Sequence, residues 1–194
     1  MKRCLVVLMG LALVGGVGAA PAMATHEIVI GLLCDRTGAT QVVGVNLCPG
    51  SHDYVRLVNS KGGVEGHKIK LLEVDHEYKV PPAVEAYERF KKEGAVTVVL
   101  YGTPIAYALT QKVTEDRIPG ITPGFGRSDA TDGTRFPYIF PLMATYWSQA
   151  TAAVKFAKDQ LGGSLKGKKI AYLFFDNPAG REPIPVLEDL ARLE

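Results

Sequence analysis

Residues 95–116 read AVTVVLYGTPIAYALTQKVTED, and this stretch decides the fold class. The apolar, β-branched run at 95–101 is typical of a buried strand. The Gly-Thr-Pro turn at 102–104 follows, and the apolar spacing over 105–116 predicts a helix that starts close to its proline. A strand, a tight turn and a helix make up one half of a βαβ unit, from which parallel sheets are built.

The same alternation of strand and helix extends along the chain in both directions. Further strands are predicted at 27–33, 67–74, 118–121 and 136–140, and further helices at 42–59 and 83–92. We therefore predict an α/β fold, a parallel sheet with helices on both faces. Ligands bind at the carboxyl ends of the strands in such sheets, so the important loops are 35–40, 102–105 and 122–129.

After residue 144 the pattern restarts with a helix at 146–161, a strand at 169–175 and a helix from Pro183 onwards. One strand and two helices do not enclose a core. We therefore expect a first lobe at 25–143, itself incomplete, and only the start of a second lobe at 144–194. On this interpretation the chain is an N-terminal fragment. Its second lobe should expose an apolar face that includes Val154, Phe156, Leu173 and Leu190.

The N-terminal 24 residues, MKRCLVVLMGLALVGGVGAAPAMA, have the features of a secretory signal peptide. Two cations precede an apolar core, and small residues end in an A-x-A cleavage site at Ala24. The alternative is a membrane anchor, but the apolar stretch is short and no stop-transfer pattern follows. The expected location of the mature protein is periplasmic or secreted.

Charge and cysteine content narrow the function classes. Lys and Arg number 22 against 20 Asp and Glu among 194 residues, and Lys2 and Arg3 account for the net charge of +2. The mature chain has no basic bias, so we expect no nucleic-acid partner. Cys34 and Cys48 follow the cleavage site and enter an oxidising compartment. Both a disulfide and two separate buried thiols remain open, because sequence does not give their Cα distance.

Several motifs together resemble one known family. They are the DRTG turn at 35–38, VNSKGGVEGHKI at 58–69, the GTP turn after the strand at 95–101, and IPGITPGFG at 118–126. The most specific piece is N-x-x-G-G-x-x-G, at residues 59–66. Over residues 25–181 the chain resembles the extracytoplasmic substrate-binding proteins of ABC transporters for branched-chain amino acids, which have the type I periplasmic binding fold.

The resemblance implies a receptor that closes two lobes around a small ligand and delivers it to an ABC permease. It implies no enzyme activity, cofactor or metal. By position, the family's serine after the third strand falls on Thr103, whose hydroxyl can donate to a ligand carboxylate. Capping of the following helix is the other possible role of Thr103. The residues expected at the ligand are Thr37, Gly102, Thr103, Gly124, Phe125, Gly126 and Tyr146.

Two departures from the family pattern bear on the ligand. Gly126 stands where the family has a threonine, and Phe125 adds a ring, which together favour an aromatic or larger apolar carboxylate over a simple aliphatic amino acid. The loop at 176–180 lacks the aromatic residue that family members often carry there. We therefore expect an amino-acid-like or an aromatic or apolar carboxylate.

Two functions from other classes remain as alternatives, a secreted α/β hydrolase and the ligand-sensing domain of a signalling receptor. A hydrolase of this fold would need a nucleophile elbow, G-x-S-x-G, or a plausible Ser-His-acid set. The serines without that context are Ser51, Ser60, Ser128, Ser148 and Ser164. A metal site is not expected either, because alternation along a strand separates the only candidate ligands. These candidates are His67, Asp75, His76 and Glu77.

Overall fold

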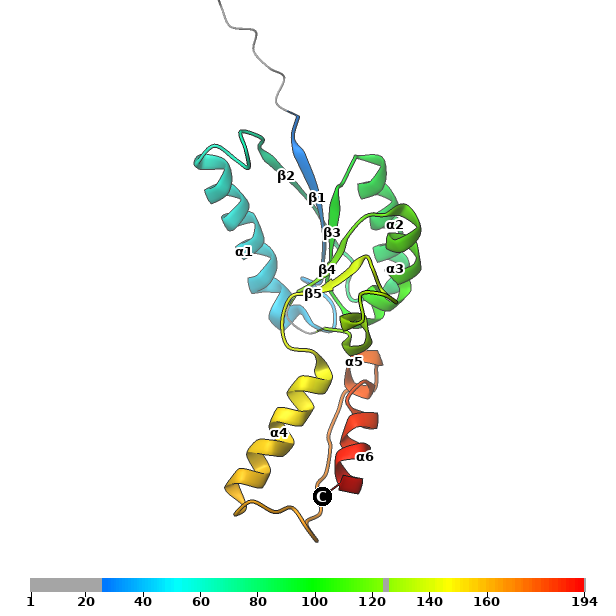
Figure 1. Ribbon diagram of the computed structural model, residues 1–194. Helices are drawn as coiled ribbons and strands as arrows, with labels where there is room; N and C mark the ends of the chain where they lie inside the picture. Colours follow the sequence, from blue (N-terminus) through cyan, green and yellow to red (C-terminus); the bar gives the residue numbers. More distant parts are fainter. Residues whose placement is uncertain (1–25, 124–125, 194) are drawn as a thin grey trace, which may run out of the picture.

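A five-stranded parallel sheet forms the first lobe of the computed structural model, which describes residues 26–123 and 126–193 (Figure 1). The strands are β1 (Ile28–Cys34), β2 (Ile69–Asp75), β3 (Thr97–Leu100), β4 (Gly120–Thr122) and β5 (Ile139–Pro141). Their order is β2-β1-β3-β4-β5, and every neighbouring pair is parallel. The predicted α/β fold is therefore confirmed.

Helices cover both faces of this sheet. Helix α1 (Gln41–Ser60) lies on one face, and α2 (Val80–Lys92) and α3 (Thr103–Asp116) lie on the other (Figure 1). The alternation of side chains along β1 explains this division. Leu32 is buried in one cluster with Cys48 of α1, whereas Leu33 is buried in the other with Phe90 of α2.

Two helices begin earlier than the sequence predicts. Helix α2 begins at Val80 instead of residue 83, with Pro81 and Pro82 inside its first turn, and α3 begins at Thr103, before Pro104. Proline lacks an N–H group, and the first turn of a helix leaves N–H groups without intrahelical partners anyway. The prolines therefore lie inside these helices and do not precede them.

The chain beyond the sheet is helical where it is regular. After β5 come α4 (Tyr146–Gln160), α5 (Pro178–Arg181) and α6 (Ile184–Leu193), whereas a short 3₁₀ helix, η1 (Ser128–Thr131), lies between β4 and β5. Helices α4 and α6 extend away from the sheet (Figure 1). The predicted strand at 169–175 is wrong. A strand needs a neighbour to share backbone hydrogen bonds, and none of the described residues pairs with this segment.

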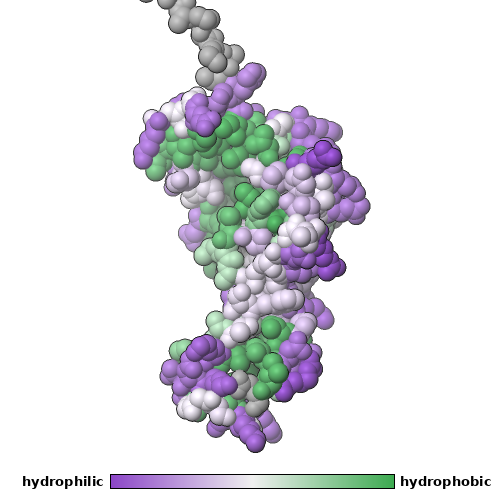
Figure 2. All heavy atoms as spheres, viewed as in Figure 1, coloured by the Kyte–Doolittle hydropathy of each residue, from purple (hydrophilic) through white to green (hydrophobic). Residues whose placement is uncertain are grey.

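The expected apolar face of the second lobe is partly present. Phe156 is 66% exposed and Leu173 is 96% exposed, as expected. Val154 and Leu190 are only half-buried, because α4 and α6 pack side by side around a hollow of about 600 Å³ that both residues line. Figure 2 shows apolar side chains across this lower part of the molecule. None of the helices in the described ranges combines the length and the apolar character needed to cross a bilayer.

Candidate functional site

A cavity of about 320 Å³ lies at the carboxyl edge of the sheet, between the two lobes. Its first wall is formed by Thr40, Val43, Tyr78, Tyr101, Gly102, Thr103 and Pro123. Its second wall is formed by Tyr146, Tyr172, Phe174, Phe175, Asn177, Ala179 and Gly180. Strands β1 and β3 are neighbours, and the helices that follow them lie on opposite faces. Such a point opens a crevice at the strand ends, and ligands bind there.

Thr103 and Tyr146 connect the two walls directly. Thr103 is buried, with 6% of the residue exposed. Its hydroxyl lies 2.9 Å from the Tyr146 hydroxyl, and either oxygen can be the donor. Thr103 is the first residue of α3 and Tyr146 the first residue of α4, so the two helix starts meet here. A hydroxyl pair of this kind can turn its hydrogens toward a ligand oxygen.

Burial keeps three of the four phenols that line the cavity protonated. Burial raises the pKa of Tyr78 to about 12 and also raises the pKa of Tyr101 and of Tyr146. At neutral pH each phenol is therefore an uncharged hydrogen-bond donor. The Tyr101 hydroxyl donates to the backbone oxygen of Thr40 at 3.1 Å, which joins the loop after β1 to the end of β3.

The turn after β1 is organised by Asp35, which is fully buried. Its carboxylate accepts hydrogen bonds from the backbone N–H of Gly38 at 2.5 Å and of Thr40 at 2.7 Å, and from the Thr40 hydroxyl at 2.7 Å. Short polar side chains that bond their own backbone in this way stabilise turns. Asp35 therefore forms the turn and places Thr40 in the cavity wall.

The structure brings three of the seven expected ligand residues together. Gly102, Thr103 and Tyr146 line the cavity. Thr37 does not line the cavity. Its hydroxyl instead donates to Asp75 Oδ2, at 2.8 Å. Gly126 is also outside the lining and forms an isolated bridge with Thr145.

The remaining two expected residues, Gly124 and Phe125, lie outside the described residues. The preceding residue, Pro123, does line the cavity. The loop after β4 therefore reaches the site at its first residue, as the parallel topology requires.

Most of the aromatic lining was missed by the sequence analysis. Tyr78 follows β2, and Tyr172, Phe174 and Phe175 come just before the loop at 176–180, where an aromatic residue was sought. The run YLFF at 172–175 was a usable signal, because it comes directly before the loop that supplies Asn177 to the cavity wall. No lining residue within the described ranges carries a charged side chain.

A disulfide ties α1 to the sheet beside this site. Cys34 ends β1 and Cys48 lies in α1, and the structure joins them with a Cα–Cα distance of 6.4 Å. This distance lies within the usual range for disulfides. Of the two arrangements that the sequence left open, the structure contains the disulfide.

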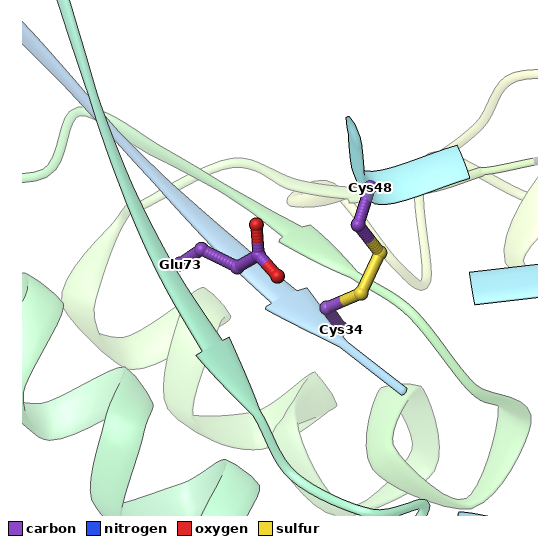
Figure 3. Close-up of side chains that lie close together, drawn as sticks. All are labelled: Cys34, Cys48 and Glu73. Carbon is purple, nitrogen blue, oxygen red and sulfur yellow. A yellow bond between two sulfur atoms is a disulfide. The ribbon is translucent and has the colours of Figure 1, made fainter. Parts of the chain in front are cut away.

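The disulfide also accounts for a group of potential metal ligands. Within the described ranges, ligand atoms of Cys34, Cys48 and Glu73 come within 4.8 Å of one another (Figure 3). The two sulfurs are bonded to each other, however, and Glu73 is hydrogen-bonded to Arg36 and His52. Thiolates are the form of cysteine that binds metals, so this group offers no free thiolate in the disulfide form.

Comparisons with known proteins agree with this architecture. The profile described as "Periplasmic binding protein" matches residues 27–193. The chain belongs to this family. A search of curated proteins found no match.

Several solved structures are similar to this chain. A structure from the Pseudomonas fluorescens group, titled as an ABC transporter permease, is 41% identical, with a TM-score of 0.73 over 86% of this chain and 42% of that one. A Thermus thermophilus branched-chain amino acid ABC transporter with bound valine is 23% identical, with a TM-score of 0.78 over 87% and 43% of the two chains.

A fatty acid ABC transporter substrate-binding protein from Thermomonospora curvata is 24% identical, with a TM-score of 0.76 over 86% of this chain and 42% of that one. At this identity the likeness shows the fold alone. The family member described here spans less than half the length of each of these three structures.

Proposed function

We propose that this periplasmic binding protein is an extracytoplasmic solute-binding receptor. It captures a small amino-acid-like or aromatic or apolar carboxylate between two lobes and delivers the ligand to an ABC permease. The ligand is bound by hinge closure of the lobes, and no covalent chemistry takes place.

One observation carries this proposal: the cavity has a wall from each lobe, and Thr103 and Tyr146 meet across it. A receptor that closes around its ligand needs polar groups on both sides of such a gap. Pockets of this kind are mostly apolar, with a few placed polar groups that orient the ligand. In this cavity the aromatic rings form the apolar surface, and the hydroxyls of Thr103 and Tyr146 can orient the ligand.

The lining supports a ligand with an apolar body and one carboxylate. The valine and the fatty acid in the titles of two similar structures both have this chemistry. The donors on this chain are the Thr103 hydroxyl and the protonated phenols of Tyr78 and Tyr146. Aromatic faces on the second wall would stack against a ring or an alkyl chain.

The proposed location is periplasmic, after removal of a signal peptide near Ala24. The first 25 residues lie outside the described residues, so the support comes from their sequence. The Cys34–Cys48 disulfide is consistent with this proposal, since disulfides persist in oxidising compartments.

Binding can be tested by calorimetry and thermal denaturation with leucine, valine, phenylalanine, phenylacetate and octanoate as probes. At least one probe should raise the melting temperature and remain chemically unchanged, because a ligand that binds only the folded state stabilises it. If no probe binds, or if a carboxylic ester is hydrolysed with turnover, the receptor proposal is wrong and a hydrolase is favoured.

The two hydroxyls can be tested with matched variants. Thr103→Val and Tyr146→Phe should each weaken carboxylate binding by about 10-fold or more, since a hydrogen bond to a charged group is worth about 1.5–3 kcal/mol. Thr114→Val on the same helix is the control for the first, because its hydroxyl bonds only the backbone oxygen of Thr110. Tyr54→Phe is the control for the second, since Tyr54 is exposed on α1.

A further inference from the structure

We propose that Glu182 is a positioning residue that latches the second lobe onto the first and thereby sets the width of the binding cavity. Its consequence for ligand binding rests on the proposed function, whereas its mechanical role does not. Glu182 itself does not line the cavity.

Three hydrogen bonds join Glu182 to elements other than α5. Its Oε1 accepts a hydrogen bond from the backbone N–H of Ser128 at 2.5 Å, and its Oε2 accepts one from the Tyr107 hydroxyl at 3.0 Å. Its backbone oxygen accepts a third from the Trp147 indole N–H at 3.1 Å. Hydrogen bonds to an ionised carboxylate are among the strongest in proteins.

The three partners come from three elements that are themselves joined. Ser128 is buried in η1, Tyr107 lies in α3 and Trp147 lies in α4. The Ser128 hydroxyl also accepts a hydrogen bond from the Trp147 backbone N–H at 3.1 Å. Glu182 therefore contacts η1, α3 and α4 at the point where the first lobe meets the start of the second.

Arg127 fixes the ring of Tyr107 in place. Its guanidinium lies 4.1 Å from the Tyr107 ring centroid and donates to Asp129 Oδ1 at 2.5 Å and to the Thr110 hydroxyl at 2.9 Å. Burial and the charge of Glu182 both raise the pKa of Tyr107, which keeps its hydroxyl a donor. The Tyr107 hydroxyl is therefore fixed in position, and Glu182 forms the hydrogen bond by moving to it.

The latch lies close in sequence to the second cavity wall. Asn177, Ala179 and Gly180 line the cavity, and they cap or lie in the short helix α5, which ends directly before Glu182. If Glu182 leaves Tyr107 and Ser128, these wall residues move away from Thr103 with it. The latch therefore holds the two walls at the separation that forms the cavity, as hinge-closing contacts do.

The latch has a built-in spectroscopic probe, because Trp147 is the only tryptophan of the chain. Glu182→Ala keeps the backbone oxygen that accepts from the indole but removes both carboxylate hydrogen bonds, so this segment should move away from Trp147. Trp147 emission should then shift to longer wavelength, with more quenching by acrylamide, because the indole becomes more exposed. Tyr107→Phe should give a smaller shift in the same direction. Glu182→Gln keeps an acceptor oxygen for Ser128 and should restore most of the wild-type emission.

Glu188→Ala is the matched control, since this exposed glutamate lies six positions further along, in α6. Tyr107→Phe added to Glu182→Ala should cause no further shift, because the two residues act through one contact. Wild-type emission in both Glu182→Ala and Tyr107→Phe would overturn the proposal, as would an equal shift in Glu188→Ala. Tyr107→Phe removes a single oxygen atom, so it decides the question even if Glu182→Ala does not fold.

The effect on ligand binding is measured with a probe that binds the wild-type chain, chosen from leucine, valine, phenylalanine, phenylacetate and octanoate. Glu182→Ala should weaken that probe by about 10-fold, with Thr103 and Tyr146 unchanged, because part of the binding energy must now close the gap. Unchanged affinity together with shifted emission would show that the latch does not set the cavity. If none of the five probes binds the wild-type chain, the receptor proposal fails, and the emission measurements still decide whether the latch exists.

Discussion

Glu73 joins two other elements to β2, beside the disulfide. Its side chain is 13% exposed, contacts Arg36 through both carboxylate oxygens, and lies 2.6 Å from His52 Nε2. The hydrogen bond from Arg36 is the main reason that the pKa of Glu73 lies below its ordinary value of 4.5. Glu73 therefore stabilises the loop after β1 and the middle of α1 only while it is ionised.

The pH dependence of stability follows from this shift. A carboxyl group whose pKa is lower in the folded state stabilises the protein above its unfolded pKa, and this stability is lost as pH falls through the folded pKa. Glu73→Gln should lower the free energy of unfolding at pH 7 by about 2 kcal/mol and reduce the loss of stability below pH 4.5. Urea denaturation from pH 7 to pH 3 measures both effects.

Glu85→Gln, on the exposed side of α2, is the control for this experiment. It should leave the slope of stability against pH as in the wild type. A Glu73→Gln profile parallel to that of the wild type below pH 4.5 would contradict the assigned role of Glu73.

The disulfide makes a separate residue-scale prediction for the mature chain, from residue 25 onwards. A thiol assay on denatured, unreduced protein should find no free thiol, because Cys34 and Cys48 are joined. Cys48→Ser should lower stability by about 3 kcal/mol, the expected effect of opening a loop of this length. Two titratable thiols before reduction would show that the cysteines are separate.

The sequence predicted residues that line the cavity where a loop follows a strand, and their contact with a ligand stays a prediction. Thr103 was found because it follows the third strand, and every strand of a parallel sheet ends at the same edge. Thr37 was chosen from a turn whose internal hydrogen bonds the sequence does not show. Asp35 orders that turn so that Thr40 reaches the cavity instead.

At the scale of elements, two glycines of α1 make a matched pair. A Cβ added to Gly44 would lie 1.7 Å from the backbone oxygen of Asp35, whereas a Cβ on Gly50 would meet nothing within 4 Å. Gly44→Ala should therefore force α1 away from β1 and destabilise the protein by about 1–3 kcal/mol. Gly50→Ala should stabilise it by about 0.5–1 kcal/mol, through helix propensity alone.

Thermal and urea denaturation of both variants provide the measurement. Equal stability of Gly44→Ala and wild type would show that α1 is not packed against the turn at Asp35. The same shift in both variants would show that helix propensity decides the result at each position.

The sheet was predictable because its signals are local. Each strand from β1 to β5 is a short segment, either apolar or alternating, between turn residues, and its partners are strands of the same sheet. The segment at 169–175 has the same local pattern and forms no strand. Whether this segment forms a strand depends on a neighbouring strand that the local sequence does not specify. None of the described residues pairs with it.

At the scale of the whole molecule, the two lobes differ in how their apolar residues are covered. The sheet of the first lobe has buried clusters on both faces, which include Leu32 on one side and Phe90 on the other. In the second lobe, Ile170, Leu173 and Phe175 are each more than 60% exposed. Sequence periodicity predicts which side chains are apolar but not which of them are covered, because coverage depends on neighbours distant in sequence.

This difference predicts where proteases cut the chain first. The segment 161–175 has no backbone ladder, and it carries exposed lysines at 166, 168 and 169. Trypsin should cleave there first, leaving a product trimmed toward residue 145, because proteases act on locally open segments. Chymotrypsin should cut the same segment at Tyr172, Phe174 or Phe175. Mass spectrometry of a digestion time course measures the order of cleavage.

The loop between α1 and β2 is an internal control, since it also carries exposed lysines, at 61 and 68. Its backbone is held, because the Asn59 side chain bonds both the N–H and the C=O of Ile69, and Gly63 N–H donates to Val58. Exposure alone would make the two segments equally sensitive, whereas backbone hydrogen bonding protects the loop. First cleavage at Lys61 or Lys68, or a full-length chain that resists both proteases, would contradict this account of the second lobe.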